Sequence, residues 1–554
     1  MKEPLEALLR DACDRAAKGG ELLTTTLPPL FLTVPKEESH GDLATNLALV
    51  LARGEGRSPR AVAETIVRHL EDPDGILANV EIAGPGFINF RFAPAYWWRC
   101  LGASEAAGEA YGRSQAGAGR RVQIEFVSAN PTGPLHVGHA RGAVTGDALA
   151  SLLAATGHEV DREYYVNDTG NQMEMLGAST YARYAELCGH PVPVPGDGYH
   201  GAYVRDVAAA ILAREGPRWM DADPAEARAH LRDQAGAMLL DDIRTDTAAL
   251  GIRFDRFVSE RQLRAEGAVA ATLDVLAAAG FVYEADGARW FRSTDFGDDK
   301  DRPLVKSDGE YTYFAADIAY HRDKFARGFD RIIDVWGADH HGHVPRMKAA
   351  LGALGLDPAC LEVVLVQVVS LTRGGEPVRM GKRSGEFVTL REVVEEVGAD
   401  ATRFFLLMRK SDAQLEFDLD LAKQRSAENP VFYVQYAHAR VASVFRAAAE
   451  MGLDRARAAT ADPSRLALAE EQALIRWIAH FLEVVGASAL ELEPHRLVFF
   501  LMELAGDFHR YYNRTRILSE DRELSAARLL LVANVQKVIR VGLTMLGIAA
   551  PDTM

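Results

Sequence analysis

The pattern of apolar and polar positions divides the chain into three kinds of segment. Up to about Gly117, helix-like stretches such as 41–53 alternate with short strand patterns at 80–82 and 87–92, which indicates a small mixed α/β domain. Toward the C-terminus the period is almost entirely helical, and residues 428–554 are predicted to form a helix bundle. Between these two segments lie buried-strand patterns that alternate with helices.

The middle segment has the pattern of a nucleotide-binding parallel sheet. A strand over 121–128, dense in Val, Ile and Phe, ends at a Pro- and Gly-containing loop, and a long helix follows over about 137–155. Later come a strand over 331–336, a helix over 344–354 and a strand over 361–369. A buried strand, a tight loop and a helix form the first unit of such a sheet. The two stretches are therefore predicted to be halves of one split sheet.

The predicted fold is a multidomain α/β protein. Its regions are a small N-terminal α/β domain (1–117), a split Rossmann-type parallel-sheet domain (118–375) with a mostly helical insertion at about 181–290, a loop region (376–425) and a C-terminal all-α helix bundle (426–554). The length of 554 residues agrees with several domains, since about 100–200 residues form one domain.

Composition narrows the class of protein. Hydrophobic residues make up 48% and charged residues 25%, as in soluble globular proteins. The start lacks a signal-peptide pattern, and no uninterrupted apolar run has the roughly 20 residues of a membrane span, so a cytoplasmic protein that uses no membrane is expected. The four cysteines are far apart without a Cys-x-x-Cys pair, which indicates neither zinc nor a disulfide framework.

The net charge of −16 argues at first against a nucleic-acid partner, because phosphate binding needs positive surface. Basic residues nevertheless gather locally, as at Arg510, Arg514 and Arg516. Charge alone therefore does not decide whether the protein binds nucleic acid.

The segment from His136 to His139, His-Val-Gly-His, lies between the first strand and its helix. Backbone N–H groups at a helix N-terminus attract anions, and Gly138 allows close approach of a ligand. The two histidines are three residues apart and so lie on one side of a helical turn, where both could stabilise charge on a transferring phosphate. The alternative is that they cap the helix or bind a metal.

A second candidate motif is Arg379-Met380-Gly381-Lys382-Arg383-Ser384-Gly385, in a loop after the last predicted sheet strand. A lysine on a glycine-containing loop can close over a leaving pyrophosphate. The alternative is an ordinary basic surface loop.

Together and in this order, the two motifs resemble the HIGH and KMSKS signatures of class I aminoacyl-tRNA synthetases. The second departs from the family pattern, with Arg379 in place of the first Lys and Gly381 in place of Ser, while Lys382 is retained. The resemblance implies that His136, His139 and Lys382 are catalytic, and that these three bind ATP with Gly138 and Met380.

Four further stretches resemble the arginyl-tRNA synthetase family in particular. They are Glu125–His136, Tyr164–Gln172, Trp336–His343 and Tyr433–Arg440. N-terminal segments resemble that family's extra domain, so the similarity covers nearly the whole chain and is weakest at 189–232.

The resemblance assigns two groups of residues to arginine. The positions matching Glu125, Tyr313 and Asp317 would bind its side chain, since a guanidinium favours carboxylates in bidentate geometry. Ser128, Asn130 and His340 would lie near its amino and carboxylate groups. The alternatives are a strand-end ion pair for Glu125 and a helix cap for Asp317.

Two regions are implied for transfer RNA. In the C-terminal bundle, Tyr433, Tyr436 and Arg440 lie on one predicted helical face and suit stacking on splayed bases, with Arg510 and Met554 as further candidates. The alternative for the tyrosines is bundle core. In the N-terminal domain, Asn89 and Phe90 match a region that touches the outer corner of the tRNA.

The implied activity is ATP-dependent ligation in two steps, through arginyl-adenylate to arginyl-tRNA(Arg), with Mg²⁺ brought by ATP and no zinc. The expected partners are tRNA(Arg), L-arginine and ATP, and the chain is expected to be a monomer. The resemblance further implies that adenylate forms only with tRNA bound. Three alternatives stay open: a small-molecule nucleotidyltransferase, a non-catalytic tRNA-binding relative, and specificity for another amino acid.

Overall fold

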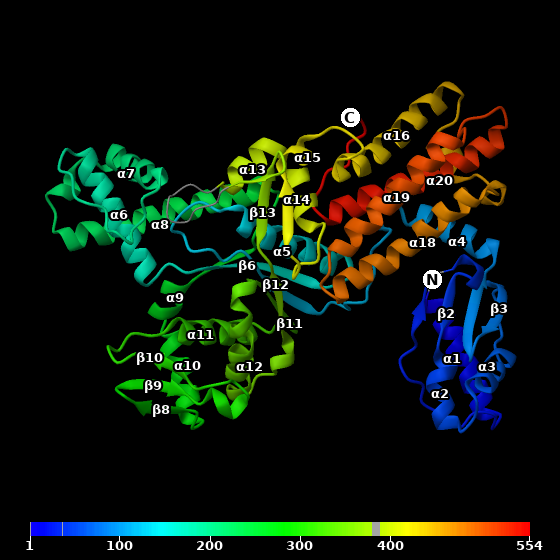
Figure 1. Cartoon of the computed structure of the whole chain (residues 1–554), viewed down its shortest axis with the longest axis horizontal. Helices are drawn as coiled ribbons and strands as arrows, with labels where there is room; N and C mark the ends of the chain where they lie inside the picture. Colours follow the sequence, from blue (N-terminus) through cyan, green and yellow to red (C-terminus); the bar gives the residue numbers. More distant parts are fainter. Residues whose placement is uncertain (1, 36, 379–387) are drawn as a thin grey trace.

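The computed structural model describes residues 2–35, 37–378 and 388–554. Its centre is a five-stranded sheet in the order β12-β11-β5-β6-β7, in which every neighbouring pair is parallel (Figure 1). The strands are β5 (Arg121–Glu125), β6 (Glu159–Val166), β7 (Arg256–Ser259), β11 (Arg331–Gly337) and β12 (Leu361–Val366). The predicted multidomain α/β fold with a parallel sheet is confirmed.

The order of the strands creates a switch point between β5 and β11. From β5 the chain adds β6 and β7 on one side, and then returns to add β11 and β12 on the other. Ligands of open α/β sheets bind outside the carboxyl ends of the strands at such a point. Glu125, the last residue of β5, therefore lies where a ligand is expected.

Helix α5 (Val137–Ala155) has the predicted bounds and packs closely on the sheet. Its apolar residues, such as Val144 and Leu149, are wholly buried. A Cβ on Gly146 would lie 2.3 Å from Cγ of Phe126, so only glycine allows this approach to the end of β5.

The strand predicted over 121–128 is shorter in the structure, because β5 ends at Glu125. Val127 and Ser128 then adopt positive φ angles of 70° and 43°, which breaks the extended run. Local side-chain bonding accompanies this turn, since Ser128 Oγ donates a hydrogen bond to Glu125 Oε1 at 2.7 Å. The predicted strand was too long because the apolar residues continue beyond Glu125, where the turn ends the strand.

The predicted insertion at 181–290 is not one helical unit, because it includes β7 of the central sheet. Before β7, three helices with their own core project from the sheet; after β7, two helices and an antiparallel sheet lead to α11 and α12 (Figure 1). These elements are α6 (Asn171–Leu187), α7 (Ala202–Glu215), α8 (Pro224–Ala249), α9 (Glu260–Ala265), α10 (Ala268–Ala278), β8 (Val282–Ala285), β9 (Ala288–Phe291), β10 (Arg302–Val305), α11 (Tyr313–Ala326) and α12 (Val344–Ala353).

The strand predicted over 361–369 is also divided. β12 ends at Val366, and the next strand joins a separate small sheet beside short helices. The buried guanidinium of Arg141 in α5 secures this region by donating to the carbonyls of Gln367, Lys410 and Ala413. The elements are β13 (Val369–Arg373), β14 (Glu376–Pro377), α13 (Leu390–Val397), α14 (Ala399–Leu407), β15 (Leu415–Asp418) and α15 (Leu419–Lys423).

The N-terminal domain combines helices with an antiparallel sheet in the order β1-β2-β4-β3. The helix predicted over 41–53 starts later, because its first part forms strand β2. The elements are α1 (Lys2–Lys18), β1 (Leu32–Thr33), β2 (Leu43–Thr45), α2 (Leu47–Glu55), α3 (Pro59–Arg68), β3 (Leu77–Ala83), β4 (Phe87–Phe92) and α4 (Pro94–Ala107).

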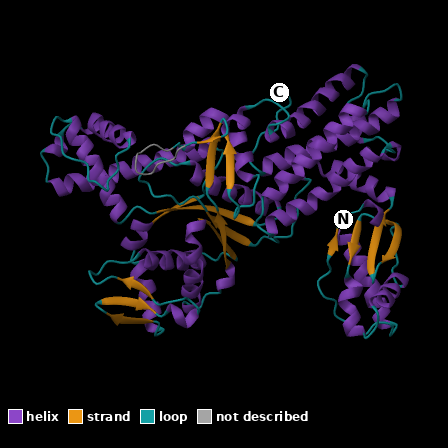
Figure 2. Ribbon diagram, in the orientation of Figure 1, coloured by secondary structure: helices purple, strands orange, loops and turns teal. Residues whose placement is uncertain are grey.

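The C-terminal bundle is all helical, as predicted (Figure 2). One member, α18, is long and apolar enough to cross a membrane by length and composition, but half of its most apolar window is buried against protein, including α19 and α4. It is therefore a core helix of the bundle. The helices are α16 (Pro430–Glu450), α17 (Arg455–Ala459), α18 (Ala469–Leu490), α19 (His495–Arg514) and α20 (Arg522–Met545).

A wholly buried arginine joins the bundle to the sheet domain. The guanidinium of Arg403 in α14 donates to Asp147 Oδ2 of α5 at 2.6 Å, to the Leu250 carbonyl after α8 at 2.9 Å and to the Leu546 carbonyl after α20 at 2.7 Å. One side chain thus ties three separate parts of the chain together.

Candidate functional site

The His136–His139 segment forms the start of α5. His136 is the N-cap residue, and its Nδ1 accepts the Gly138 N–H at 3.1 Å, while His139 Nδ1 accepts the His136 N–H at 3.3 Å. The two imidazoles stack with their centroids 3.8 Å apart. A Cβ on Gly138 would lie 2.9 Å from His136 Cε1, so the glycine makes this cap fit. The capping alternative is confirmed, and both rings lie together at a helix N-terminus suited to anions.

The second motif falls at 379–387, outside the described residues, so the structure places neither Met380 nor Lys382. The chain that follows returns to the first motif. The Leu390 N–H donates to the Leu135 carbonyl at 2.7 Å, and Thr389 forms an antiparallel bridge with His136. The chain at Thr389 and Leu390, just after the second motif, is therefore bonded to the first motif.

Beside this edge, Glu125 belongs to a buried charge cluster. Lys324 of α11, with no exposed surface, places Nζ 2.5 Å from Glu125 Oε2 and 2.7 Å from Asp334 Oδ1. His321 Nε2 lies 2.7 Å from the other oxygen of Asp334. The ion-pair alternative for Glu125 is thus confirmed as geometry. Its Oε1 accepts from Ser128 and so remains directed toward the carboxyl end of β5.

The two carboxylates of this cluster are shifted in opposite directions. Burial raises the pKa of Glu125, and the attraction of Lys324 only partly offsets this. Burial acts on Asp334 too, but attraction and hydrogen bonds from Lys324 and His321 outweigh it and lower the pKa of Asp334. Glu125 is therefore the carboxylate that takes up a proton first.

Helix α11 carries Tyr313 and Asp317, the other two residues predicted to bind the arginine side chain. Asp317 Oδ2 lies 3.1 Å from His343 Nε2, and its side chain keeps 31% of its surface exposed. Tyr313 begins the helix, is 53% exposed, and lies beside Gly170. The cap of this helix is Thr312 rather than Asp317, which corrects the helix-cap alternative.

The candidates for the amino and carboxylate groups are more scattered. Ser128 contacts Glu125 directly, and Asn130 Nδ2 donates to Oε1 of Gln172, at the start of α6, at 2.6 Å. The side chain of His340 is 59% exposed, with its ring centroid 6.2 Å from that of Trp336. The fold thus brings Glu125 and Ser128 into contact, whereas the His340 side chain is exposed to solvent.

Sequence patterns did not identify Lys324, Asp334, His321 or His343. Lys324 and Glu125 are 199 residues apart, and the charged positions of α11 look in sequence like an ordinary solvated face. The one available signal was the placement of Asp334 inside an apolar strand, where an unpaired charge would be costly.

The described residues contain no group of three or more His, Cys, Asp or Glu side chains arranged to hold a metal ion.

Three family models match successive parts of the chain. They are the arginyl-tRNA synthetase N-terminal domain over 3–92, the class I (R) tRNA synthetase catalytic domain over 106–424, and the DALR anticodon-binding domain over 434–554. The arginine–tRNA ligases of Syntrophotalea carbinolica and Desulfosudis oleivorans are each 51% identical, over 554 and 556 residues, with both chains fully covered.

The chain belongs to the arginyl-tRNA synthetase family. It is accordingly an enzyme of the class I aminoacyl-tRNA ligases. A solved arginyl-tRNA synthetase structure from Campylobacter jejuni agrees, with a TM-score of 0.78 and 35% identity over 84% of this chain and all of that one. The Thermus thermophilus structure, at 24% identity and TM-score 0.78 over both whole chains, supports the fold.

In the synthetase N-terminal domain, the two predicted tRNA residues lie mostly inside. Phe90 is wholly buried in the core of the domain, so its side chain is not on the surface that would touch the outer corner of the tRNA. Asn89 is 6% exposed and lines a shallow hollow with residues that include His40, Glu81 and Arg91. Alternation along β4 accounts for this burial, since Ile88, Phe90 and Phe92 face the core whereas Phe87 is exposed.

In the DALR region, the predicted helical face is present. Tyr436 is 37% exposed, and the Arg440 guanidinium lies 4.6 Å from its ring centroid and 4.8 Å from that of Tyr512. Tyr433 and Tyr436 both pack against the His509 ring. The two alternatives for these tyrosines were a base-stacking surface and bundle core. Each ring has features of both, because one side packs on α19 and the other meets solvent.

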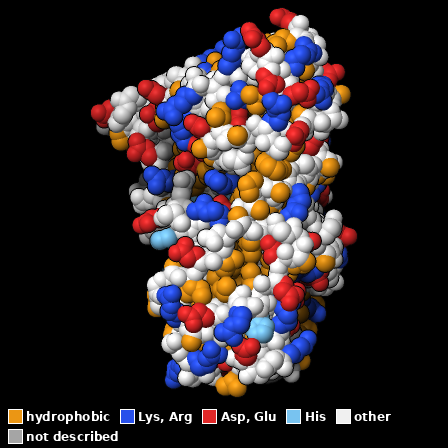
Figure 3. Space-filling model, turned by 90° about the vertical axis from the view of Figure 1, so that its right-hand side faces the viewer, with side chains coloured by type: hydrophobic (Ala, Val, Ile, Leu, Met, Phe, Trp, Pro, Cys, Tyr) orange, Lys and Arg blue, Asp and Glu red, His pale blue; other side chains and the backbone are white. Residues whose placement is uncertain are grey.

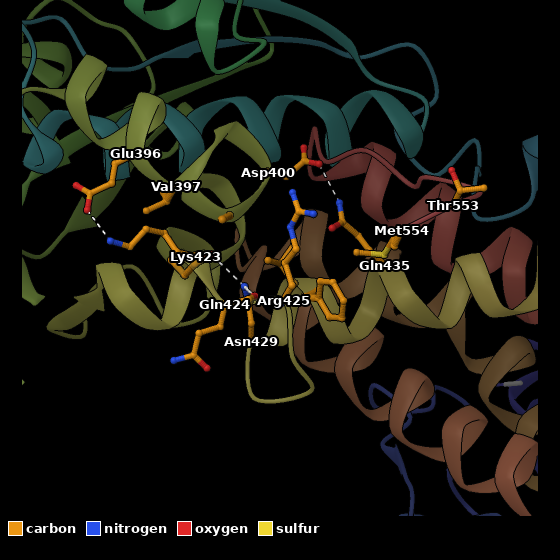
Figure 4. Close-up of a pocket in the computed structure, with 14 residues that line it drawn as sticks. Glu396, Val397, Asp400, Lys423, Gln424, Arg425, Asn429, Gln435, Thr553 and Met554 are labelled. Atoms are coloured by element: carbon orange, nitrogen blue, oxygen red, sulfur yellow. Dashed lines mark hydrogen bonds and ion pairs between the residues drawn. The ribbon is translucent and has the colours of Figure 1, made fainter. Parts of the chain in front are cut away.

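The remaining two candidates are Arg510, which like Tyr433 lies beside Gly506, and Met554. Arg510 is largely exposed and pairs with Asp507. Met554 is 52% exposed and lines a hollow of about 530 Å³ between α13–α15 and the start of α16. Figure 4 shows Lys423 directed at Glu396 in this hollow, and Met554 beside Gln435.

Charge is mixed over this end of the synthetase. Figure 3 shows Lys and Arg side chains interspersed with Asp and Glu, without a single broad basic field. Recognition of a polyanion there depends on individual Arg and aromatic groups more than on net charge.

Proposed function

We propose that the chain joins L-arginine to tRNA(Arg) through arginyl-adenylate, and that the carboxyl end of β5 is the reaction site. The observation that carries this assignment is the position of Glu125. It ends the strand at the switch point of the sheet, and the same loop leads on to the His136 cap and the N-terminus of α5. A carboxylate for a cation and a helix N-terminus for a phosphate are thus placed side by side.

Glu125, Tyr313 and Asp317 bind the guanidinium of arginine. Lys324 and Ser128 fix the Glu125 carboxylate, while Asp317 is oriented by His343. A planar guanidinium with five N–H donors suits two carboxylates and a phenol from different sides. Ser128, Asn130 and His340 lie at the amino and carboxylate end of the substrate.

The first step is attack of the arginine carboxylate on the α-phosphorus of ATP, with pyrophosphate as the leaving group. His136, Gly138 and His139 present helix N–H groups and imidazoles to the phosphates, where charge develops in the transition state. Met380 and Lys382 are assigned to the same step on motif resemblance. Mg²⁺ enters with ATP as part of the substrate.

The second step is attack of the terminal ribose hydroxyl of tRNA(Arg) on the activated carbonyl, which releases AMP. Tyr433, Tyr436 and Arg440, with Met554 and Arg510 farther out, bind the anticodon part of the tRNA, and the hollow at Asn89 binds its outer corner. Adenylate formation requires bound tRNA, and the enzyme acts as a cytoplasmic monomer. Arginine-dependent exchange between ATP and pyrophosphate without tRNA would contradict the first of these statements, and sedimentation tests the second.

The amino-acid assignment is tested by charging tRNA with each of the standard amino acids in turn. Arginine alone is expected to give stable charging. Preferred charging by another amino acid would overturn the assignment, and nucleotidyl transfer without tRNA charging would favour a small-molecule nucleotidyltransferase.

The role of the imidazole pair is tested with His139→Ala. A loss of arginylation rate of at least about 100-fold is expected, because a positioned transition-state donor contributes on this order. The matched control is His190→Ala, an exposed histidine in the helical insertion. An unchanged rate in His139→Ala would favour a purely structural cap.

A further inference from the structure

Tyr165 is a buried tyrosine near the end of β6, and its hydroxyl makes no well-formed hydrogen bond among the described residues, although the Glu260 carboxylate is near enough to serve as its acceptor. Its side chain is only 7% exposed, and its ring stacks on Tyr320 of α11 with centroids 4.3 Å apart. A buried hydroxyl normally finds a partner, because leaving it unpaired costs the full desolvation of the group. Tyr165 therefore needs an explanation.

The neighbouring tyrosines are all satisfied. Tyr164 Oη donates to the Ala129 carbonyl at 2.7 Å, and Tyr320 Oη donates to Glu163 Oε1 at 2.6 Å. Both are at most 2% exposed, so burial alone does not distinguish them from Tyr165. What distinguishes Tyr165 is therefore the set of groups around its hydroxyl, not the degree of burial.

That place is the acidic edge described above. The Tyr165 N–H donates to Ser128 Oγ at 3.1 Å, and the same oxygen donates to Glu125. Burial, and then the nearby carboxylates of Glu260, Asp317 and Glu125, raise the pKa of Tyr165 far above its usual range. The phenol therefore stays protonated and neutral among three carboxylates.

Two of these carboxylates are the proposed side-chain ligands of arginine, while the third is already engaged. Glu260 is 1% exposed, pairs with Arg264 at 2.6 Å and accepts from Thr169 at 2.9 Å. Glu125 and Asp317, held by Lys324 and His343, are the two carboxylates that the proposed site directs at the ligand, and both act on the Tyr165 hydroxyl. A guanidinium between them has N–H donors to spare.

We propose that Tyr165 is a further arginine-recognition residue, whose Oη accepts a hydrogen bond from the substrate guanidinium. This inference rests on the proposed arginine site. Binding of the substrate supplies a donor to the Oη lone pair, while the O–H itself faces the Glu260 carboxylate, so this contact is gained only in the complex. Glu125 and Asp317 provide charge, and Tyr165, held by its ring stack on Tyr320, provides a neutral acceptor.

The test is Tyr165→Phe, which removes the hydroxyl and keeps the ring stack. KM for arginine is expected to rise about tenfold, the equivalent of one modest hydrogen bond to a charged group. KM for ATP and for tRNA, and kcat, should stay within about twofold. The thermal midpoint of the ligand-free enzyme should not fall, because no well-formed protein hydrogen bond is lost.

Tyr111→Phe is the matched control. Tyr111 is 5% exposed, but its hydroxyl donates to the Ile478 carbonyl at 2.9 Å, far along the chain from the sheet edge. This variant should lower the thermal midpoint and leave KM for arginine unchanged. The two variants thus have opposite expected signatures.

The arginine concentration needed to raise the thermal midpoint by half its maximum gives a second measurement, independent of turnover. It should shift upward in Tyr165→Phe together with KM. A lowered midpoint with unchanged KM would show a structural role and overturn the inference, as would no change in either quantity.

Asp317→Asn distinguishes failure of the Tyr165 inference from failure of the proposed arginine site. If it raises KM for arginine strongly and Tyr165→Phe does not, the inference about Tyr165 alone is wrong. If neither variant changes KM for arginine, the proposed arginine site itself is wrong.

Discussion

The sheet edge around Glu125 and the outer face of α16 use charged and aromatic side chains in opposite ways. At the sheet edge, Lys324 and Asp334 have no exposed surface, and each charge is held by partners within the protein. On α16, Arg440 lies over Tyr436, which is 37% exposed, and both groups meet solvent. At the sheet edge the charges are held in position before a ligand binds. On α16 the groups contact water in the free protein and can contact a partner instead.

The difference follows from the size of the proposed ligands. An amino acid side chain contributes few contacts, so each must be oriented in advance by buried neighbours. A tRNA covers a large surface, and stacking on exposed rings tolerates small adjustments. Disturbing the first region should therefore reduce stability and specificity together, whereas disturbing the second should change affinity alone.

The largest expected effect comes from Lys324→Met. It leaves Glu125 and Asp334 buried without their shared cation, and breaking a buried pair in this way costs about 3–5 kcal/mol of unfolding free energy. Denaturant unfolding at pH 7 measures the loss. The double variant Lys324→Met, Glu125→Gln should regain part of it by removing one of the stranded charges.

Lys423→Met is the control for that prediction. Lys423 also joins two carboxylates, Glu396 and Asp420, but on the surface of the molecule. Its removal should change stability far less, because solvent screens exposed pairs. Equal losses in the two lysine variants would break the comparison between the regions.

The next largest effect is expected for Arg440→Ala, which should weaken tRNA(Arg) binding about tenfold or more, the order of one lost stacking contact. Stability and KM for arginine should change little. Fluorescence anisotropy with labelled tRNA at fixed ionic strength measures Kd. Arg446→Ala is the control, since Arg446 lies on the same helix and bonds only locally, to Ser443. Equal losses of affinity in both variants would show that general positive charge matters rather than the stacked Arg440.

The smallest effect is a pH dependence that separates the two carboxylates of Lys324. The pKa of Glu125 is raised above 4.5, so on acidification it is protonated first, and KM for arginine should rise by at most about tenfold per pH unit as the pH approaches that raised value. The pKa of Asp334 is lowered below 3.8, so its stabilising contribution is present above about pH 4 and is lost only as the pH falls through the lowered pKa.

Measurement of KM for arginine and of unfolding free energy over the same pH series should therefore give two separated transitions. Glu125→Gln should remove the pH dependence of KM above pH 4.5. Loss of stability before loss of arginine affinity would reverse the assignment of the two protonations.

Local patterns were sufficient to predict much of this architecture. Helix α5 was predicted with its observed bounds, because its apolar run starts at a capping residue and ends before a glycine. The parallel sheet and the helical C-terminal region follow from the same kind of signal. Strand β7 was missed, because its four residues, Arg-Phe-Val-Ser, are too few and too polar to stand out between long helices.

The candidate site was predicted in its residues but not in its connections. Motifs named Glu125 and Asp317, while Lys324 and His343 contact them from other elements of the fold. Phe90 shows the reverse case, in which a motif position is buried because strand alternation places it in the core. Residue identity is local information, whereas the partner of a side chain depends on the whole fold.

The three-way contact of Arg403 has a consequence for the order of events on the ribosome. Its guanidinium gains its third acceptor only when the Leu546 carbonyl is present, and that residue is synthesised 143 residues later. Until then the guanidinium, which is buried in the finished protein, lacks one of its three acceptors. The part of the chain already synthesised therefore cannot complete its packing around Arg403. Premature termination before Leu546 should therefore yield nascent chains that proteases recognise, which couples completion of translation to survival of the product.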